Sequence, residues 1–268
     1  MASAIDPRLV AALHPLAVRH GALGDERAAP RVVFQTATIA ALLDGAYDGD
    51  LTIAELREHG DLGLGTFDAL DGEMIVVDGE VWRARVDGTV SPVGDDECTP
   101  FAAVTPFTAD VTVAVERELS WDELLALAAA NSPMESGAFA LRFDGALPAV
   151  HARSAPKQPR PYLPLAEAAA SLRDFMLAPS DGTLVGFCFP PEAAGVELPG
   201  FHLHVITADR TRGGHVLSAR VGPGTLRLGA LSTLHIELPP GVELPPTGAT
   251  DAAGAAVLRR IEGDARES

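Results

Sequence analysis

The sequence predicts an α+β fold, in which two closely joined α/β-type halves are built on mixed and antiparallel β-sheets with a few short helices. Predicted strands outnumber predicted helices, and they cluster in hairpins. The dipeptides Asp78-Gly79 and Asp87-Gly88 each suit a two-residue hairpin turn. Residues 200–221 form a third hairpin around a polar loop that ends in two glycines. A chain of 268 residues is long enough to bury a large core.

A proline-rich stretch divides the chain. Residues 155–164 contain four prolines, which disfavour regular structure and predict a stiff connector. Before it we expect an N-terminal extension over 1–30, partly mobile, and an N-terminal half with a mixed sheet over 31–154. After it, residues 165–268 form a C-terminal half that carries the third hairpin and a C-terminal tail.

Helices are predicted where capping residues precede an apolar run. Thr52 is followed three residues later by Glu55, and Ser120 by Glu123, and both pairs have the spacing of a capping box. Proline at position 7 suits the first turn of a helix. In chain order the predicted helices cover 7–14, 39–47, 53–59, 121–130, 165–176 and 250–261.

Runs of apolar and β-branched residues predict the strands. Outside the third hairpin they cover 31–34, 73–77, 81–86, 89–93, 111–116, 138–143, 149–153, 183–189, 225–231 and 234–238. Strand 73–77 is hydrophobic enough to extend a sheet across a two-fold axis. Residues 60–67 are rich in glycine but lack both the Gly-Lys-Ser/Thr ending of a phosphate loop and the Gly-x-Gly-x-x-Gly spacing. We expect these glycines to form tight turns beside a site.

Charge and cysteine content restrict the partners and the compartment. The net charge is -17 and Lys157 is the only lysine, so we expect no nucleic-acid partner and no anionic-membrane partner. The N-terminus has no basic segment followed by a long apolar core, and no run approaches the roughly 18 apolar residues of a membrane span. Cys98 and Cys188 are far apart and lack a CxxC partner, which favours free thiols in the reducing cytoplasm.

Three histidines of the third hairpin predict a metal site. His202 and His204 are two residues apart on a predicted strand, so their side chains point to the same face. The returning strand brings His215 back towards this pair. A single histidine in a strand is ordinarily a hydrogen-bonded core or surface residue. Three converging imidazoles, however, are typical of a catalytic zinc site that keeps one position open for water or substrate.

Several motifs, in order along 33–239, resemble those of the α-acetolactate decarboxylase family. They are Phe34-Gln35-Thr36, the glycine-rich 60–67, Leu70-Asp71-Gly72-Glu73, Thr99-Pro100-Phe101, and the run from Gly-x-His-x-His to Gly-Gly-His. The resemblance implies a zinc-dependent carboxy-lyase of acetoin and butanediol metabolism. Such an enzyme converts 2-acetolactate to acetoin and carbon dioxide through a metal-bound enediolate, without an organic cofactor. The resemblance also suggests a homodimer.

The same resemblance implies a set of site residues. The zinc ligands correspond to His202, His204 and His215, and the active-site threonine and glutamate to Thr66 and Glu73. The family's arginine, which would orient the departing carboxylate, falls on Arg153 in a segment that departs from the usual motif. A second glutamate corresponds to Glu262 in the C-terminal tail. We favour Glu73 as the proton donor or its relay, with Glu262 as alternative or partner.

Two other functions fit parts of the sequence. A cupin-like metal-dependent oxygenase or isomerase, acting on a small hydroxy or keto acid, also begins its metal site with His-x-His on a strand. The glutamate that normally follows in such a site is missing from 205–208. A non-catalytic sheet protein that binds a small acid or stores metal would have no need of Thr66, Glu73 and Arg153.

Overall fold

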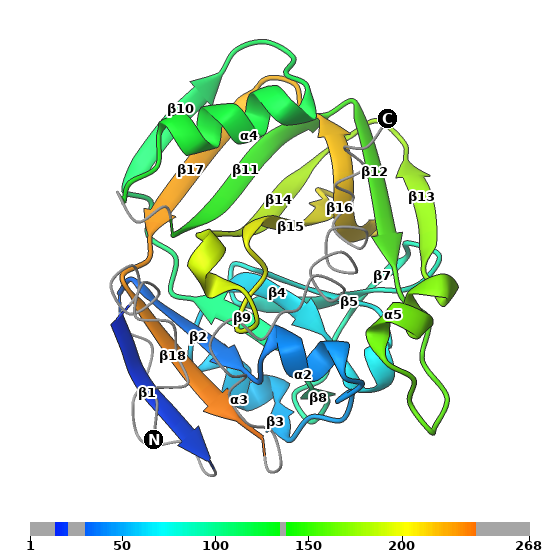
Figure 1. The fold of residues 1–268 in the computed structure, drawn as a ribbon. Coiled ribbons are helices and arrows are strands. Elements are labelled where there is room, and N and C mark those ends of the chain that lie inside the picture. The colour runs from blue at the N-terminus through cyan, green and yellow to red at the C-terminus, as the bar shows by residue number, and fades with distance from the viewer. Residues whose placement is uncertain (1–13, 21–29, 135–137, 240–268) are drawn as a thin grey trace.

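The described residues of the computed structural model, 14–20, 30–134 and 138–239, form two eight-stranded sheets, a two-stranded sheet and short helices (Figure 1). The first sheet has the order β1 (His14–His20), β18 (Thr233–Leu238), β2 (Val32–Thr36), β9 (Ala102–Thr105), β4 (Leu62–Thr66), β5 (Glu73–Val77), β6 (Glu80–Ala84), β7 (Val90–Pro92). The second has the order β10 (Val111–Val115), β17 (Gly224–Ala230), β11 (Phe139–Leu147), β14 (Ser180–Phe189), β15 (Gly200–Thr207), β16 (Gly213–Arg220), β12 (Ala149–Ser154), β13 (Arg173–Leu177). The small sheet pairs β3 (Leu51–Thr52) with β8 (Cys98–Thr99).

The expected fold class is confirmed. The first sheet is mixed, because β18 runs parallel to both β1 and β2 while the other strand pairs of this sheet are antiparallel. In the second sheet the described strand pairs are antiparallel. Each predicted strand overlaps an observed one. Both sheets take strands from either side of residues 155–164, since β10, β11 and β12 join the second sheet and β18 joins the first. The proposed division of the chain at 155–164 stays a prediction.

One large core cluster joins the two sheets. Ile75 from the first sheet and Val185 and Ile206 from the second belong to one set of buried side chains. A second cluster lies on the other side of the second sheet, where helix α4 (Trp121–Ala130) buries Leu124 and Ala128 against it (Figure 1). Successive side chains along the strands of the second sheet therefore pack alternately into one cluster and the other.

Both predicted capping boxes are confirmed, at Thr52 with Glu55 and at Ser120 with Glu123. The helices that follow, α3 (Ile53–Arg57) and α4, begin where the boxes place them. The remaining described helices are α2 (Ile39–Leu43), α5 (Leu165–Ala168) and three short 3-10 turns, η1 (Asp68–Leu70), η2 (Ala169–Ser171) and η3 (Pro191–Ala193). Helix α2 is shorter than the predicted 39–47.

The predicted helix over 165–176 is confirmed in its first part, where α5 covers Leu165–Ala168, and is wrong in its second part. Helical structure stops at Ser171, and the chain continues as β13, which pairs with β12 at the edge of the second sheet. Backbone hydrogen bonds to a strand distant in sequence replace those of a helix here, which local patterning does not reveal.

The glycine-rich segment 60–67 forms a strand instead of the expected turns. β4 lies between β9 and β5, and glycine allows these backbones to approach closely. A Cβ on Gly63 would lie 2.1 Å from the Ala103 carbonyl oxygen, and one on Gly65 2.4 Å from that of Phe101. The idea that strand 73–77 extends a sheet across a two-fold axis is also wrong, because β5 is flanked by β4 and β6.

Some predictions fall outside the described residues. Among them are the helix over 250–261 and the C-terminal tail. Positions 1–13 of the N-terminal extension, with the part of its predicted helix that they contain, also lie outside. Within that extension, residues 14–20 form strand β1. The helices in the described part of the chain are all too short or too polar to cross a membrane.

Candidate metal centre and active-site pocket

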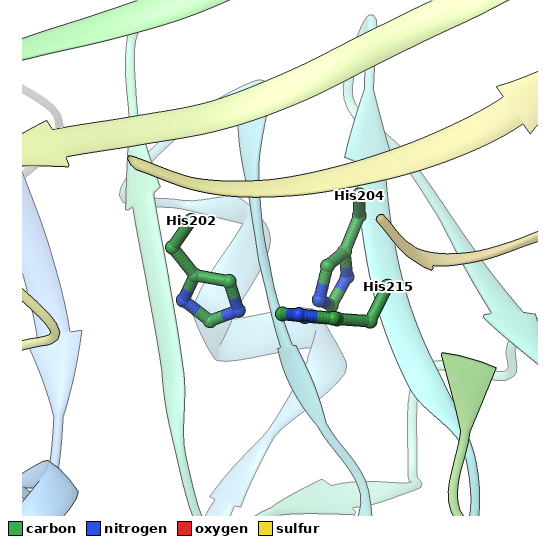
Figure 2. Close-up of side chains that lie close together, drawn as sticks. All are labelled: His202, His204 and His215. Carbon is green, nitrogen blue, oxygen red and sulfur yellow. The ribbon is translucent and has the colours of Figure 1, made fainter. Parts of the chain in front are cut away.

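Three histidines converge on one point between the two sheets (Figure 2). His202 and His204 project from the same face of β15, and His215 lies directly opposite His204 on β16. The ring centroids are 5.2 Å apart for His202 and His204, 5.1 Å for His202 and His215, and 5.3 Å for His204 and His215. One nitrogen from each ring lies within 4.8 Å of the other two, so the group could hold a metal ion. The predicted convergence of the three imidazoles is confirmed.

A carbonyl oxygen of the first sheet orients His204. The His204 Nδ1 lies 2.7 Å from the oxygen of Met74 on β5, so Nδ1 carries the proton and donates it. The Nε2 atom is then an acceptor, and it is buried with no hydrogen-bond partner among the described residues. A buried lone pair facing two other imidazoles fits a bound cation, and the carbonyl is the outer contact that metal-binding histidines usually make.

Burial keeps the three imidazoles neutral. It lowers the pKa of His204 to about 4 and those of His202 and His215 well below the ordinary histidine value. The neighbouring rings lower the pKa of His202 and His215 further, as does the positive charge of Arg153 for His215, whereas the hydrogen bond to Met74 acts to raise the pKa of His204. At neutral pH the rings therefore offer lone pairs without having to release protons.

Glu73 begins β5 beside the histidines. One carboxylate oxygen lies 3.6 Å from the His204 Nε2, and the side chain is 15% exposed. Burial raises the pKa of Glu73 to about 8, while Arg153 and the backbone N–H of Ala155 act in the opposite direction. A carboxyl group with a raised pKa can hold a proton at neutral pH, which is a requirement for an acid catalyst.

Thr66 ends β4 and pairs directly with Glu73 across the two strands. Its hydroxyl donates to the Gly72 carbonyl oxygen at 2.8 Å, and its own carbonyl oxygen accepts the Thr99 hydroxyl at 2.8 Å. The first bond closes the β4–β5 connection, and the second holds the end of β4 to β8. Thr66 therefore fixes where β5 starts, and Thr66 and Glu73 line one pocket.

Arg153 lies on β12, directly opposite His215 on β16. Its Nε donates to Asp174 at 2.9 Å and its Nη2 to the other carboxylate oxygen at 3.4 Å, a two-point contact that fixes the plane of the guanidinium. Asp174 was not identified from the sequence, because residues 165–176 were expected to be a helix. The alternation of polar and apolar residues in β13 is too short a signal to identify the strand.

These residues surround one pocket. Its polar end is formed by Thr66, Glu73, Arg153, His202 and His215, and its walls by Ile39, Leu42, Leu70, Phe101, Ala155, Leu165, Leu172 and Leu198 with the backbone of Gly65. The empty space is about 640 Å³, including the part open to solvent. Such a pocket suits a small acid with short alkyl groups. Glu262 lies outside the described residues, so its position relative to this pocket stays a prediction.

Glu197 is a buried carboxyl group next to the pocket wall, and the sequence did not single it out. One oxygen accepts the backbone N–H of Leu198, and in the described part of the chain the other has no hydrogen-bond partner. Burial raises its pKa from 4.5 to about 8, so between these values the folded state binds the proton that the unfolded chain releases. The stabilising effect of that proton is complete below pH 4.5 and is lost as pH rises through 8.

Glu197→Gln should therefore increase the free energy of unfolding relative to the original protein, and more so at pH 8 than at pH 5. The difference should grow by up to about 1.4 kcal/mol per pH unit within this window. Urea unfolding at several pH values measures it. Glu192→Gln, at a partly exposed position on η3, is the control and should show no such trend. A pH-independent difference for Glu197→Gln would contradict the argument.

Comparison with known proteins gives one consistent result. A sequence model of the family described as alpha-acetolactate decarboxylase matches residues 33–244. The alpha-acetolactate decarboxylase of Methanosarcina mazei is 44% identical over 208 residues, which cover 78% of this chain and 72% of that protein. That of Bacillus subtilis is 36% identical over 207 residues, covering 77% and 81%. The crystal structure of alpha-acetolactate decarboxylase from Bacillus subtilis strain 168 superposes with a TM-score of 0.81 at 33% identity, covering 87% of this chain and 99% of that chain.

Proposed function

The chain belongs to the alpha-acetolactate decarboxylase family, and we propose that it converts 2-acetolactate to acetoin and carbon dioxide at the three-histidine pocket with a zinc ion. It is a carbon–carbon lyase of the carboxy-lyase class. The observation that carries the proposed site is the convergence of three buried histidines beside Glu73 and Arg153 in one pocket. Neutral imidazoles are ligands that zinc prefers.

The substrate explains why this pocket needs an electrophile. In 2-acetolactate one carbon bears the carboxylate and the hydroxyl, and the ketone is attached to that carbon. Loss of carbon dioxide leaves an electron pair that moves towards the ketone oxygen. A zinc ion on three neutral histidines would keep its double positive charge and would supply the electrophile that thiamine or pyridoxal supplies in other decarboxylases.

Arg153 is the residue that we propose to bind the carboxylate. A guanidinium can meet a carboxylate with two parallel N–H groups, which sets the orientation of the carboxylate as well as its position. The two bonds to Asp174 restrict rotation of the Arg153 side chain. With the guanidinium held, the bond to the departing carbon can be kept out of the plane of the ketone, as cleavage requires.

Glu73 is the residue that we propose to donate a proton to the carbon left by carbon dioxide. It lies at the polar end of the pocket beside His204, and burial favours its protonated form. A donor fixed on one side of the pocket would deliver the proton to one face of the intermediate and so would set the configuration of the acetoin. Thr66 would hold the start of β5, and Glu262 is proposed as alternative donor or partner.

The other two hypotheses for the function of the site are not favoured. A cupin-like oxygenase or isomerase does not account for a family match that extends over residues 33–244. A non-catalytic metal-storing protein would not need the carboxyl and guanidinium groups that line the same pocket as the histidines.

The proposed function predicts zinc-dependent release of acetoin. The purified protein should contain about one zinc ion per chain and should release acetoin from 2-acetolactate, because the three histidines form one site. Elemental analysis and an acetoin assay, before and after treatment with a chelator, measure both. Chelation should remove zinc and activity together, and added zinc should restore them. Stoichiometric zinc without acetoin release would refute the decarboxylase assignment and leave the metal site standing.

We also propose a homodimer in the cytoplasm. The family resemblance supports the dimer, and the two free cysteines are consistent with a reducing compartment. Sedimentation at several protein concentrations would test the dimer.

A further inference from the structure

The connection between β4 and β5 holds an unusual backbone conformation next to the pocket. Residues 67–72 join Thr66 to Glu73, and within them Ala69 has φ 60°, Leu70 φ 54° and Gly72 φ 96°. Two consecutive non-glycine residues in the left-handed region are strained, and such strain persists only where surrounding contacts enforce it. Leu70 also lines the pocket, so this connection shapes the site directly.

Arg83 on β6 contacts both ends of this connection. Its guanidinium carbon lies 4.1 Å from the centre of the Phe67 ring, and its Nη1 lies 3.5 Å from an Asp71 carboxylate oxygen. Its other terminal nitrogen is hydrogen-bonded to Glu97. The aliphatic part of Arg83 covers Gly72, where an added Cβ would lie 3.0 Å from the Arg83 Cγ. Arg83 is 8% exposed, so its side chain is largely shielded from water, whereas the carboxylates of Asp71 and Glu97 are partly exposed.

Arg83 cannot touch the substrate itself. It pairs with Met74 across β5 and β6, so its side chain lies on the same face as that of Met74. Glu73 precedes Met74 and points to the opposite face, into the pocket. Arg83 does not line the pocket, so any influence on the reaction is indirect, and its side-chain contacts with Phe67 and Asp71 lead to the 67–72 connection.

Resting on the proposed function, we propose that Arg83 is a positioning residue, which clamps the 67–72 connection so that Thr66 and Glu73 face the substrate. Three partners surround the guanidinium: an aromatic face, Asp71 and Glu97. A planar fork can stack on a ring and donate to two carboxylates at once, which a lysine ammonium cannot do in the same way. The clamp therefore requires arginine.

Arg83→Met tests the clamp, because methionine keeps an apolar stem but has neither charge nor donors. We expect kcat for acetoin release to fall about 10- to 100-fold with a smaller change in KM, since a displacement near 1 Å has effects of this size. Zinc content should not change, because the three histidines lie on the other sheet and β5, which carries the Met74 carbonyl, stays paired with β4 and β6. Hydrogen exchange of the 67–72 amides should accelerate, a readout that does not depend on activity. For Arg83→Lys, kcat and the exchange rate of the 67–72 amides should lie between those of the original protein and those of Arg83→Met.

Arg142→Met is the matched control. Arg142 is also partly buried and pairs with two carboxylates, Asp78 and Asp144, but it does not line the pocket. The Arg142→Met variant should have a lower thermal stability. Its kcat and the hydrogen exchange of its 67–72 amides should stay close to those of the original protein. The inference fails if Arg83→Met behaves like Arg142→Met. Should Arg83→Met not fold, Arg83→Lys decides, and unchanged kcat and exchange in that variant would overturn the clamp. An inactive original protein would refute the proposed function, while the exchange measurement would still test the clamp.

Discussion

His204→Ala should lose its bound metal and, with it, acetoin release. His204 is the most buried of the three histidines, and its Nε2 faces the other two rings. Alanine removes a ligand and leaves the Met74 carbonyl oxygen without its donor. Losing an outer contact of a ligand histidine costs up to about 100-fold in metal affinity or activity, and losing the ligand itself should cost at least as much. Metal content after dialysis and the acetoin assay measure the two effects.

His59→Ala separates this effect from general damage to the fold. His59 is also a buried histidine, stacked on Phe34 with ring centroids 3.7 Å apart, and it lies away from the pocket. That variant should lose stability and keep its metal. If His204→Ala were to retain one zinc ion per chain with unchanged affinity, the three-histidine centre would be wrong.

The parts of this site that were predictable from sequence are those set by local geometry. A strand places His202 and His204 on one face whatever its neighbours are, and a short glycine-ended loop returns His215 to them. The two capping boxes were likewise readable because they span four residues.

Contacts between distant segments were not predictable in the same way. The bond between His204 and the Met74 carbonyl spans 130 residues, and no residue pattern encodes a backbone acceptor. Asp174 was missed because an edge strand formed where local propensity favoured a helix. Glu73 and Arg153 were identified only through the resemblance, since a lone carboxylate or guanidinium is ordinarily a solvated side chain.

Glu73→Gln should keep the metal and lose most of the turnover. Glutamine has nearly the same shape as glutamic acid and can accept from the backbone N–H of Ala155, so the strand end should stay in place. It cannot give up a proton as an acid does, and removing a general acid typically costs 10²- to 10⁴-fold in rate, so we expect a fall of at least about 100-fold in kcat. Zinc content and KM should change little. Steady-state kinetics with metal analysis on the same preparation measure all three quantities.

Two variants decide whether the loss reflects the lost proton. Glu80→Gln makes the same chemical change at an exposed position of the adjoining strand and should leave kcat unchanged. Glu73→Asp keeps an acid but shortens it, so it should retain more activity than Glu73→Gln if proton donation is the role. Equal losses in the two Glu73 variants would indicate that Glu73 acts by shape alone. Full activity of Glu73→Gln would remove Glu73 from the reaction and leave Glu262 as the donor to test.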